Sequence, residues 1–262
     1  MHQRIFRSVA FMALVSGGAA MAGTSDEGQW VTTFTTGADM LSRSTFQERA
    51  DGGLANLGDL DSASAGASAA TSLRRFSMHD AFGLEPGLGL ELGYMADSNL
   101  EPFMKLEYSQ LQGRNARIGE LDSPALSSPA TITSKFDDAH SWSLNLGSRY
   151  FWTNYVGLKP YVAGFMGVDR TQAIRTHLAV SDLADLGEAQ LLPRQTRFDA
   201  GVEGGVSLEF ANQADLRLSV GANYVDARKQ DSDAFAPLGV DSVKLTEQRW
   251  SVPLDLGLNF RF

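Results

Sequence analysis

Histidine is the side chain best suited to proton transfer near neutral pH, and three histidines lie beyond the N-terminal segment: His79, His140 and His177. The segment DDAHSWS surrounds His140 with Asp137, Asp138, Ser141 and Ser143. Serine, histidine and a carboxylate can carry out acyl transfer, and aspartates with histidine can bind a metal ion. Both kinds of site are defined by geometry rather than by closeness in sequence. We therefore predict no catalytic residue and no metal site, and keep an enzymatic use of His140 as an alternative.

A larger set of charged residues recurs at every second position of strand-like segments. Its members are Glu85, Glu91, Lys105, Glu107, Arg149, Asp199, Glu203, Glu209, Arg217, Arg249, Asp255 and Arg261. Side chains at alternate positions share one face of a strand, and charges buried at this density must pair. We predict a polar network that fills the inside of a barrel. A narrow path for ions or small solutes is the alternative use of the same residues.

The segments that carry these charges have a period of two. In residues 249–262 every even position is apolar and every odd position is polar, small or proline, as expected for a strand with two different surroundings. The same pattern, weakest at 30–41, occurs in eight segments: 30–41, 82–94, 102–112, 142–152, 159–172, 198–210, 216–224 and 249–262. The sequence therefore predicts an all-β fold, a closed antiparallel up-and-down transmembrane β-barrel of eight strands.

The connections between these segments alternate in length. Three are short, at 96–99, 153–158 and 211–214, and four are long, near 42–81, 113–137, 173–195 and 227–247. Tight turns at one end and long extracellular loops at the other are typical of outer-membrane barrels. The first long connection is rich in Gly, Ala, Ser and Asp over residues 50–72, which predicts a mobile, exposed segment.

Aromatic residues indicate which face meets lipid. They bracket the apolar face of several segments, at Phe82, Tyr94, Trp142, Trp152, Phe198, Phe210, Trp250 and Phe260. Ten residues of a tilted strand rise about 25 Å, the height of the apolar band between two aromatic girdles. We predict that the apolar face points outward and the charged face inward.

The N-terminus and the composition limit the location of the protein. Residues 1–22 resemble a cleaved secretory signal, with a basic start, a short apolar core and Ala20-Met21-Ala22 before the expected cleavage, so that 23–262 form the barrel domain. Loss of Arg4 and Arg7 changes the formal charge from −9 to −11, which disfavours nucleic acid as a partner. The chain has no cysteine for disulfides and no apolar run long enough for a membrane-spanning helix.

The C-terminal residues resemble a known targeting signal. Asp255, Gly257, Phe260 and Phe262 stand where the C-terminal β-signal of bacterial outer-membrane proteins has its polar residue, glycine and hydrophobic anchors. By strand count the chain also resembles the small OmpA- and OmpX-like barrels, although its long connections are longer. The resemblance implies a bacterial outer-membrane location. It also implies assembly by the barrel-assembly machinery with periplasmic chaperones, and contact with lipid and lipopolysaccharide.

The expected function follows from this architecture. We expect a monomer without a cofactor and with a closed lumen, acting in membrane integrity or in surface interaction through its extracellular loops. Some eight-stranded barrels modify lipid A, so a lipid A-modifying enzyme is one alternative. A narrow small-solute or ion channel is the other.

Overall fold

The computed structural model describes residues 27–41, 45–60, 62–152, 157–211, 213–227, 229–246 and 249–262. The predicted signal peptide, residues 1–22, lies outside these ranges. Strands make up most of the described chain, and its helices are α1 (Met78–Ala81) and the 3₁₀ turns η1 (Leu57–Asp59), η2 (Ser62–Ser64) and η3 (Ala236–Leu238). No described helix is both long and apolar enough to cross a membrane.

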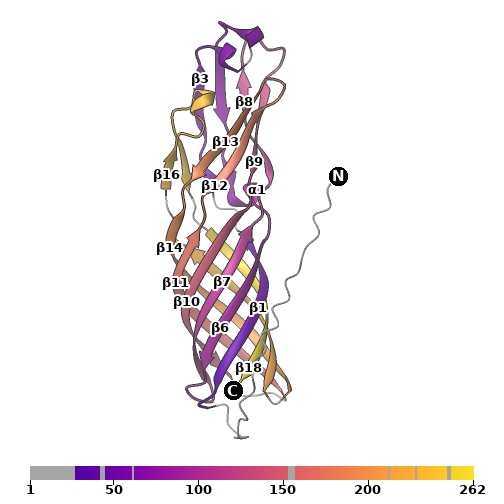
Figure 1. Cartoon of the computed structure of the whole chain (residues 1–262), viewed down its shortest axis with the longest axis vertical. Coiled ribbons are helices and arrows are strands. Elements are labelled where there is room, and N and C mark those ends of the chain that lie inside the picture. Colours follow the sequence, from indigo (N-terminus) through magenta and orange to yellow (C-terminus); the bar gives the residue numbers. More distant parts are fainter. Residues whose placement is uncertain are drawn as a thin grey trace.

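Eight strands close into a barrel, as the sequence predicts (Figure 1). They are β1 (Trp30–Leu41), β6 (Glu85–Tyr94), β7 (Leu100–Leu111), β10 (Ala139–Phe151), β11 (Leu158–Thr171), β14 (Gln195–Ala211), β15 (Ala214–Val225) and β18 (Arg249–Arg261). Each strand pairs antiparallel with its neighbours in the chain, and β1 closes the barrel by pairing with both β18 and β6. The topology is up-and-down, and the segment with the weakest alternation, 30–41, is a full barrel strand.

The outer wall of the barrel is apolar. Leu146 is 61% exposed and Val202 is 62% exposed, and aliphatic side chains like these cover the middle of the wall. Aromatic side chains lie at the ends of the strands, for example Trp142 and Trp152 on β10. A wall of this kind is stable in lipid and not in water. The eight strands therefore span a membrane.

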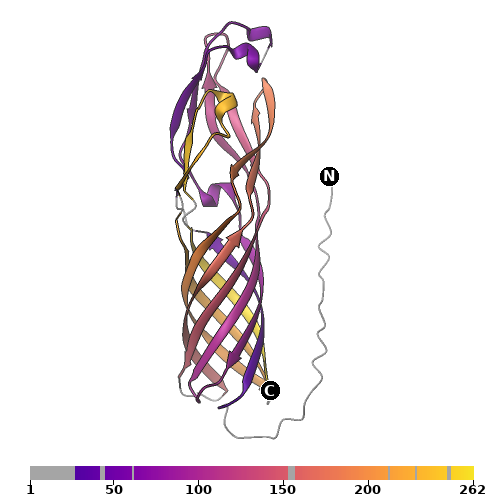
Figure 2. The same cartoon turned by 60° about the vertical axis from the view of Figure 1, so that its left-hand side comes forward.

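The long connections fold into a second structure, here called the cap, which stands on one end of the barrel (Figures 1 and 2). One sheet of the cap has the order β13-β12-β9-β8-β4-β3, and the other has the order β16-β17-β2-β5. The strands of the first are β3 (Ala50–Leu54), β4 (Ala69–Leu73), β8 (Asn115–Asp122), β9 (Ala130–Phe136), β12 (Ile174–Val180) and β13 (Ala184–Leu192). Those of the second are β2 (Thr45–Gln47), β5 (Phe76–Ser77), β16 (Lys229–Ser232) and β17 (Val243–Thr246). The barrel end beneath the cap is called the cap end, and the opposite end is the turn end.

Most described residues of the segment 50–72 are exposed or half-exposed, as predicted, but the expectation of a segment without regular structure is wrong. Residues 50–54 and 69–73 form β3 and β4, which pair with each other, and β4 also pairs with β8. Leu57, Ala69 and Leu73 are buried in the hydrophobic core of the cap. The segment is rich in small residues, and its three leucines, Leu54, Leu57 and Leu60, pack in a hydrophobic core to which the other connections also contribute.

Phe82 belongs to the cap core and not to the aromatic girdle. The prediction placed it at the outward end of a strand, yet β6 begins only at Glu85, and Phe82 is the fully buried C-cap residue of α1. It contacts Phe46 and Phe136, with ring centroids 6.2 and 5.5 Å away. Together with Phe76 these rings form a phenylalanine cluster between the cap sheets and the barrel strands.

Candidate functional site

The inside of the barrel holds the densest polar cluster of the protein, and Arg149 is its centre. Arg149 on β10 is 1% exposed and donates from Nη1 to Glu91 on β6 and to Glu101 on β7, both at 2.9 Å. Its Nη2 donates to Glu203 on β14 at 3.1 Å. Arg217 on β15 reaches the same Glu91 at 2.8 Å. Five strands thus contribute to one ionic layer, which crosses the full width of the lumen.

Aromatic rings support the guanidinium of Arg149. Its Cζ lies 4.6 Å from the ring centroid of Phe103 and 5.0 Å from that of Tyr161. The Phe103 ring occupies space that any larger residue at position 147 would need, because a Cβ on Gly147 would lie 2.5 Å from Phe103 Cζ. Glycine at this inward position therefore leaves space for the Phe103 ring, which packs against the guanidinium of Arg149.

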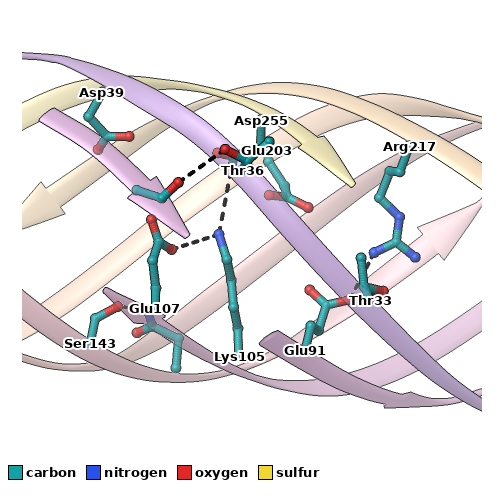
Figure 3. A network of polar contacts seen from close by, with 12 residues as sticks. Thr33, Thr36, Asp39, Glu91, Lys105, Glu107, Ser143, Glu203, Arg217 and Asp255 are labelled. Atoms are coloured by element: carbon teal, nitrogen blue, oxygen red, sulfur yellow. Dashed lines mark hydrogen bonds and ion pairs between the residues drawn. The ribbon is translucent and has the colours of Figure 1, made fainter. Parts of the chain in front are cut away.

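A second layer surrounds Lys105 (Figure 3). The Nζ of Lys105 lies 2.7 Å from Glu107 on the same strand and 3.4 Å from Asp255 on β18. Asp39 on β1 lies on the cap side of this layer and accepts a hydrogen bond from Ser251 at 2.7 Å. The strands that bear Glu107 and Asp255 are distant in sequence, so this layer depends on the closure of the barrel.

A third layer lies at the cap end. Arg249 on β18 donates to both carboxylate oxygens of Glu85 at 3.1 Å and lies 3.3 Å from Asp169 on β11. Arg197 on β14 approaches Asp169 at 2.9 Å, and Ser141 also donates to this carboxylate. At the turn end a smaller pair, Arg261 with Asp215, completes the column of charges.

The space left between the side chains is small. A cavity of about 40 Å³ lies between the Lys105 and Arg249 layers, and its acidic lining includes Asp39, Glu107, Asp199 and Asp255. A volume of this size holds on the order of two or three water molecules. Above the cavity the phenylalanine cluster covers the cap end, and below it the Arg149 layer fills the cross-section. In the described residues the lumen is therefore a polar interior packed with side chains around this small cavity.

The structure brings most of the predicted lumen residues together and leaves one out. Glu85, Glu91, Lys105, Glu107, Arg149, Asp199, Glu203, Arg217, Arg249, Asp255 and Arg261 are buried or half-buried inside the barrel. Glu209 has the inward phase of β14 but is exposed; it lies at the turn end of the strand, where its backbone is opposite that of Asp215 on β15.

Five charged lumen residues were not predicted: Asp39, Glu101, Asp169, Arg197 and Asp215. Each has the inward phase of a predicted strand: Asp39 and Asp169 lie within the predicted segments 30–41 and 159–172, and the other three lie just outside a predicted segment. Glu101 and Asp215 lie one residue before the predicted strand starts, and Arg197 lies one residue before another. Extending each predicted strand by one position at its start would have found these three.

The aromatic residues form two belts on the outer wall. Trp142, Phe198 and Trp250 are exposed at the cap end. Tyr94, Trp152, Phe210 and Phe260 are exposed at the turn end, where Trp30, Tyr150 and Phe262 add to the belt. Pairs such as Tyr224 with Trp250 and Trp30 with Tyr94 link neighbouring strands, with ring centroids 4.9 and 5.1 Å apart. Phe262, the last residue of the proposed assembly signal, accepts and donates backbone hydrogen bonds with Trp30 at 3.0 Å.

The histidines lie outside the lumen and form no hydrolytic constellation in the described residues. The Nδ1 of His140 lies 2.7 Å from the Tyr108 hydroxyl, while Ser143 lines the lumen cavity and Trp142 faces outward. His177 Nε2 lies 2.6 Å from Asp185 in the exposed β12–β13 hairpin. A backbone hydrogen bond from Gly187, aided by His177, lowers the pKa of Asp185.

The described part of the chain also holds no group of three or more His, Cys, Asp or Glu side chains arranged to bind a metal ion. The Asp138 carboxylate near His140 instead accepts hydrogen bonds at 2.9 Å from the Gln110 amide and from the backbone of Gly113.

Comparison with known proteins finds similar barrels and no sequence relative. No family model and no curated protein match the chain. Neisserial surface protein A (NspA) is similar with a TM-score of 0.39 and 16% identity over 90% of this chain and 98% of that one. OprG from Pseudomonas aeruginosa gives 0.44 and 17% over 90% and 97%, and Ail of Yersinia pestis gives 0.39 and 10% over 90% and 99%. At these values the comparison transfers no ligand or activity to this chain.

Proposed function

We propose that this protein is a non-enzymatic, outer-membrane β-barrel protein of a Gram-negative bacterium, with a closed lumen and a folded extracellular cap that acts in surface interaction. Closed β-barrels with an apolar outer wall and two aromatic belts are the form in which strands cross the outer membrane. The turn end then faces the periplasm and the cap faces the outside. Contact with lipid and with the barrel-assembly machinery belongs to the same proposal.

The packing of charged side chains across the lumen is the observation that carries the proposal. Arg149 is held by three carboxylates from three strands, and the phenylalanine cluster covers the opposite end. Moving ions through the barrel would require breaking a buried ionic layer, which costs several kcal/mol for each charge left unpaired. A structural anchor needs no such passage, whereas a channel does.

The cap gives the surface-interaction part of the proposal its support. Its two sheets share one hydrophobic core, so the cap is a folded body that stands well beyond the barrel (Figure 2). Binding residues are often found on segments that a rigid scaffold positions. A folded cap that stands beyond the barrel favours contact outside the cell.

Two measurements test the proposal. Planar bilayers containing the purified protein are expected to show no steady openings, and well-resolved steady conductance would overturn the closed lumen. Nitroxide labels at Leu146, Val202 and Leu256 are expected to collide with oxygen and to be shielded from a water-soluble nickel reagent, whereas a label at Thr133 on the cap should show the reverse. Water access at the three wall positions would overturn the membrane-spanning barrel.

A further inference from the structure

Three strand pairs continue from the barrel wall into the cap on one side of the molecule. β7, β10 and β11 are neighbours in the barrel, and β8, β9 and β12, which adjoin them in the chain, are neighbours in the cap sheet (Figure 1). Backbone hydrogen bonds bridge the junction, from Gln172 to His140 at 2.9 Å and from Asp137 to Arg175 at 3.1 Å. The outer face of this side therefore runs without interruption from the membrane into the cap.

Cations gather on this face directly above the aromatic belt. The four residues Arg114, Lys135, Arg170 and Arg175, here called the cationic patch, are all exposed. Arg170 is the cross-strand partner of Trp142, a member of the belt. In the cap, the Arg114 carbonyl accepts from Phe136, next to Lys135, and Arg175 lies beside Asp137. Strands are about 4.8 Å apart, so these three cations span roughly 10 Å.

The cationic patch has little internal compensation. None of its four members forms an ion pair with another residue in the described ranges. The carboxylates within the patch are those of Asp137 and Asp138, and Asp138 is already bound by Gln110 and Gly113. A third carboxylate, Glu188, lies level with Lys135 two strands away, because His177 is the cross-strand partner of both residues. Further from the membrane Glu120, Asp122 and Asp185 are exposed on the same sheet, where Glu120 pairs with Arg117 and Asp185 with His177. The face is basic near the membrane and acidic at its far end.

An apolar groove lies on the membrane side of the patch. Leu88, Leu90, Leu106, Tyr108 and Trp142 line this groove of about 390 Å³ on the outer wall. The Tyr108 and Trp142 rings, 4.8 Å apart, form its upper border, and His140 stacks on Tyr108 from above. An acyl chain in the groove would place its head group at the level of the belt and of the cationic patch.

We infer that this face binds the phosphorylated head group of a lipid of the surrounding leaflet, with an acyl chain of that lipid in the groove below. The inference rests on the proposed membrane-spanning barrel and names a partner for it. Basic residues next to a membrane attract anionic head groups, whose phosphates accept hydrogen bonds from arginine and lysine. A neutral or cationic ligand gains nothing from four exposed cations that form no ion pair in the described residues, and a ligand without an acyl chain leaves the groove unused.

The test uses the full chain folded in dodecyl maltoside micelles and titrated with bisphosphorylated lipid A, with bound lipid counted by native mass spectrometry. The variant K135Q/R170Q/R175Q removes three members of the patch. The matched control R49Q/K229Q/K244Q removes three exposed cations elsewhere on the cap. Lipid A without phosphates is the second probe.

The wild type and the control should bind the bisphosphorylated lipid alike, and the patch variant should bind about a hundredfold more weakly at low ionic strength, about fivefold for each cation. The inference is overturned if the control loses as much lipid affinity as the patch variant, or if the patch variant binds lipid as tightly as the wild type. It is also overturned if the wild type does not prefer the phosphorylated lipid, or if heparin displaces bound lipid A as efficiently as added lipid A does. Heat-modifiable migration on a gel reports the folded barrel separately. A protein that folds but shows no preference contradicts the inference alone, whereas a protein without the shift contradicts the proposed barrel.

Discussion

Replacing Arg149 by methionine tests the role assigned to the ionic layers. Methionine keeps the apolar stem that packs between Phe103 and Tyr161, and removes the charge that binds Glu91, Glu101 and Glu203. In the described residues Arg217 still holds Glu91 and Glu101, at 2.8 and 3.4 Å, but no other cation lies within 4 Å of Glu203.

The expected cost follows from the number of charges left without a partner. Breaking a buried ion pair from one side destabilises a protein by about 3–5 kcal/mol, and the lost cation–π contacts add about 0.5–2 kcal/mol. Because Arg217 compensates two of the three carboxylates, we expect Arg149→Met to lower the free energy of unfolding by about 4 kcal/mol. Adding Glu203→Gln removes the stranded charge and should restore about 1–3 kcal/mol.

The assay is urea unfolding in phospholipid vesicles, followed by tryptophan fluorescence and by the heat-modifiable gel shift. Arg49→Met is the control, since its pair with Asp51 is exposed on both sides, and its effect should stay within about 0.5 kcal/mol. A loss below about 1 kcal/mol for Arg149→Met, or strict additivity with Glu203→Gln, would refute the view that the layer is a tightly coupled structural element.

Two further predictions concern single positions. Gly147→Ala should lower the free energy of unfolding by about 1–3 kcal/mol, because the new Cβ meets Phe103. The control is Gly164→Ala on the outer wall, where the new Cβ meets open space, and it should leave the free energy of unfolding unchanged. Urea unfolding that ranks the two variants in the opposite order would contradict the packing argument. In the capping box of α1, the backbone of Ser77 donates to Asp80 at 3.0 Å and lowers the pKa of Asp80. A carboxyl whose pKa is lower in the folded state stabilises the fold above its unfolded pKa of about 4, and this contribution is lost as the pH falls below that value. Amide exchange of α1 should therefore accelerate between pH 5 and pH 3 by more than the intrinsic exchange rate changes. The same pH profile in Asp80→Asn would contradict the assignment.

The sequence by itself determined the eight barrel strands, and which face of each strand meets lipid and which meets the lumen. Alternation with a period of two is a local property, since neighbouring side chains must point to opposite sides of any strand. It places Leu256 in lipid and Asp255 in the lumen without knowledge of their partners. The same rule failed at Phe82 and Glu209, because alternation does not reveal where a strand stops being part of the packed wall.

Only the tertiary structure decided which charges meet and what the long connections do. Arg149 joins Glu91, 58 residues away, and Arg217 joins the same carboxylate across 126 residues. These contacts depend on the stagger between strands, which the pattern within one strand leaves free. In the cap, β4 pairs with β8 and β12 pairs with β9, so that strand pairs from three different connections join into one sheet. No single connection contains enough apolar residues to predict that core, because the free energy of burial arises only when four connections pack together.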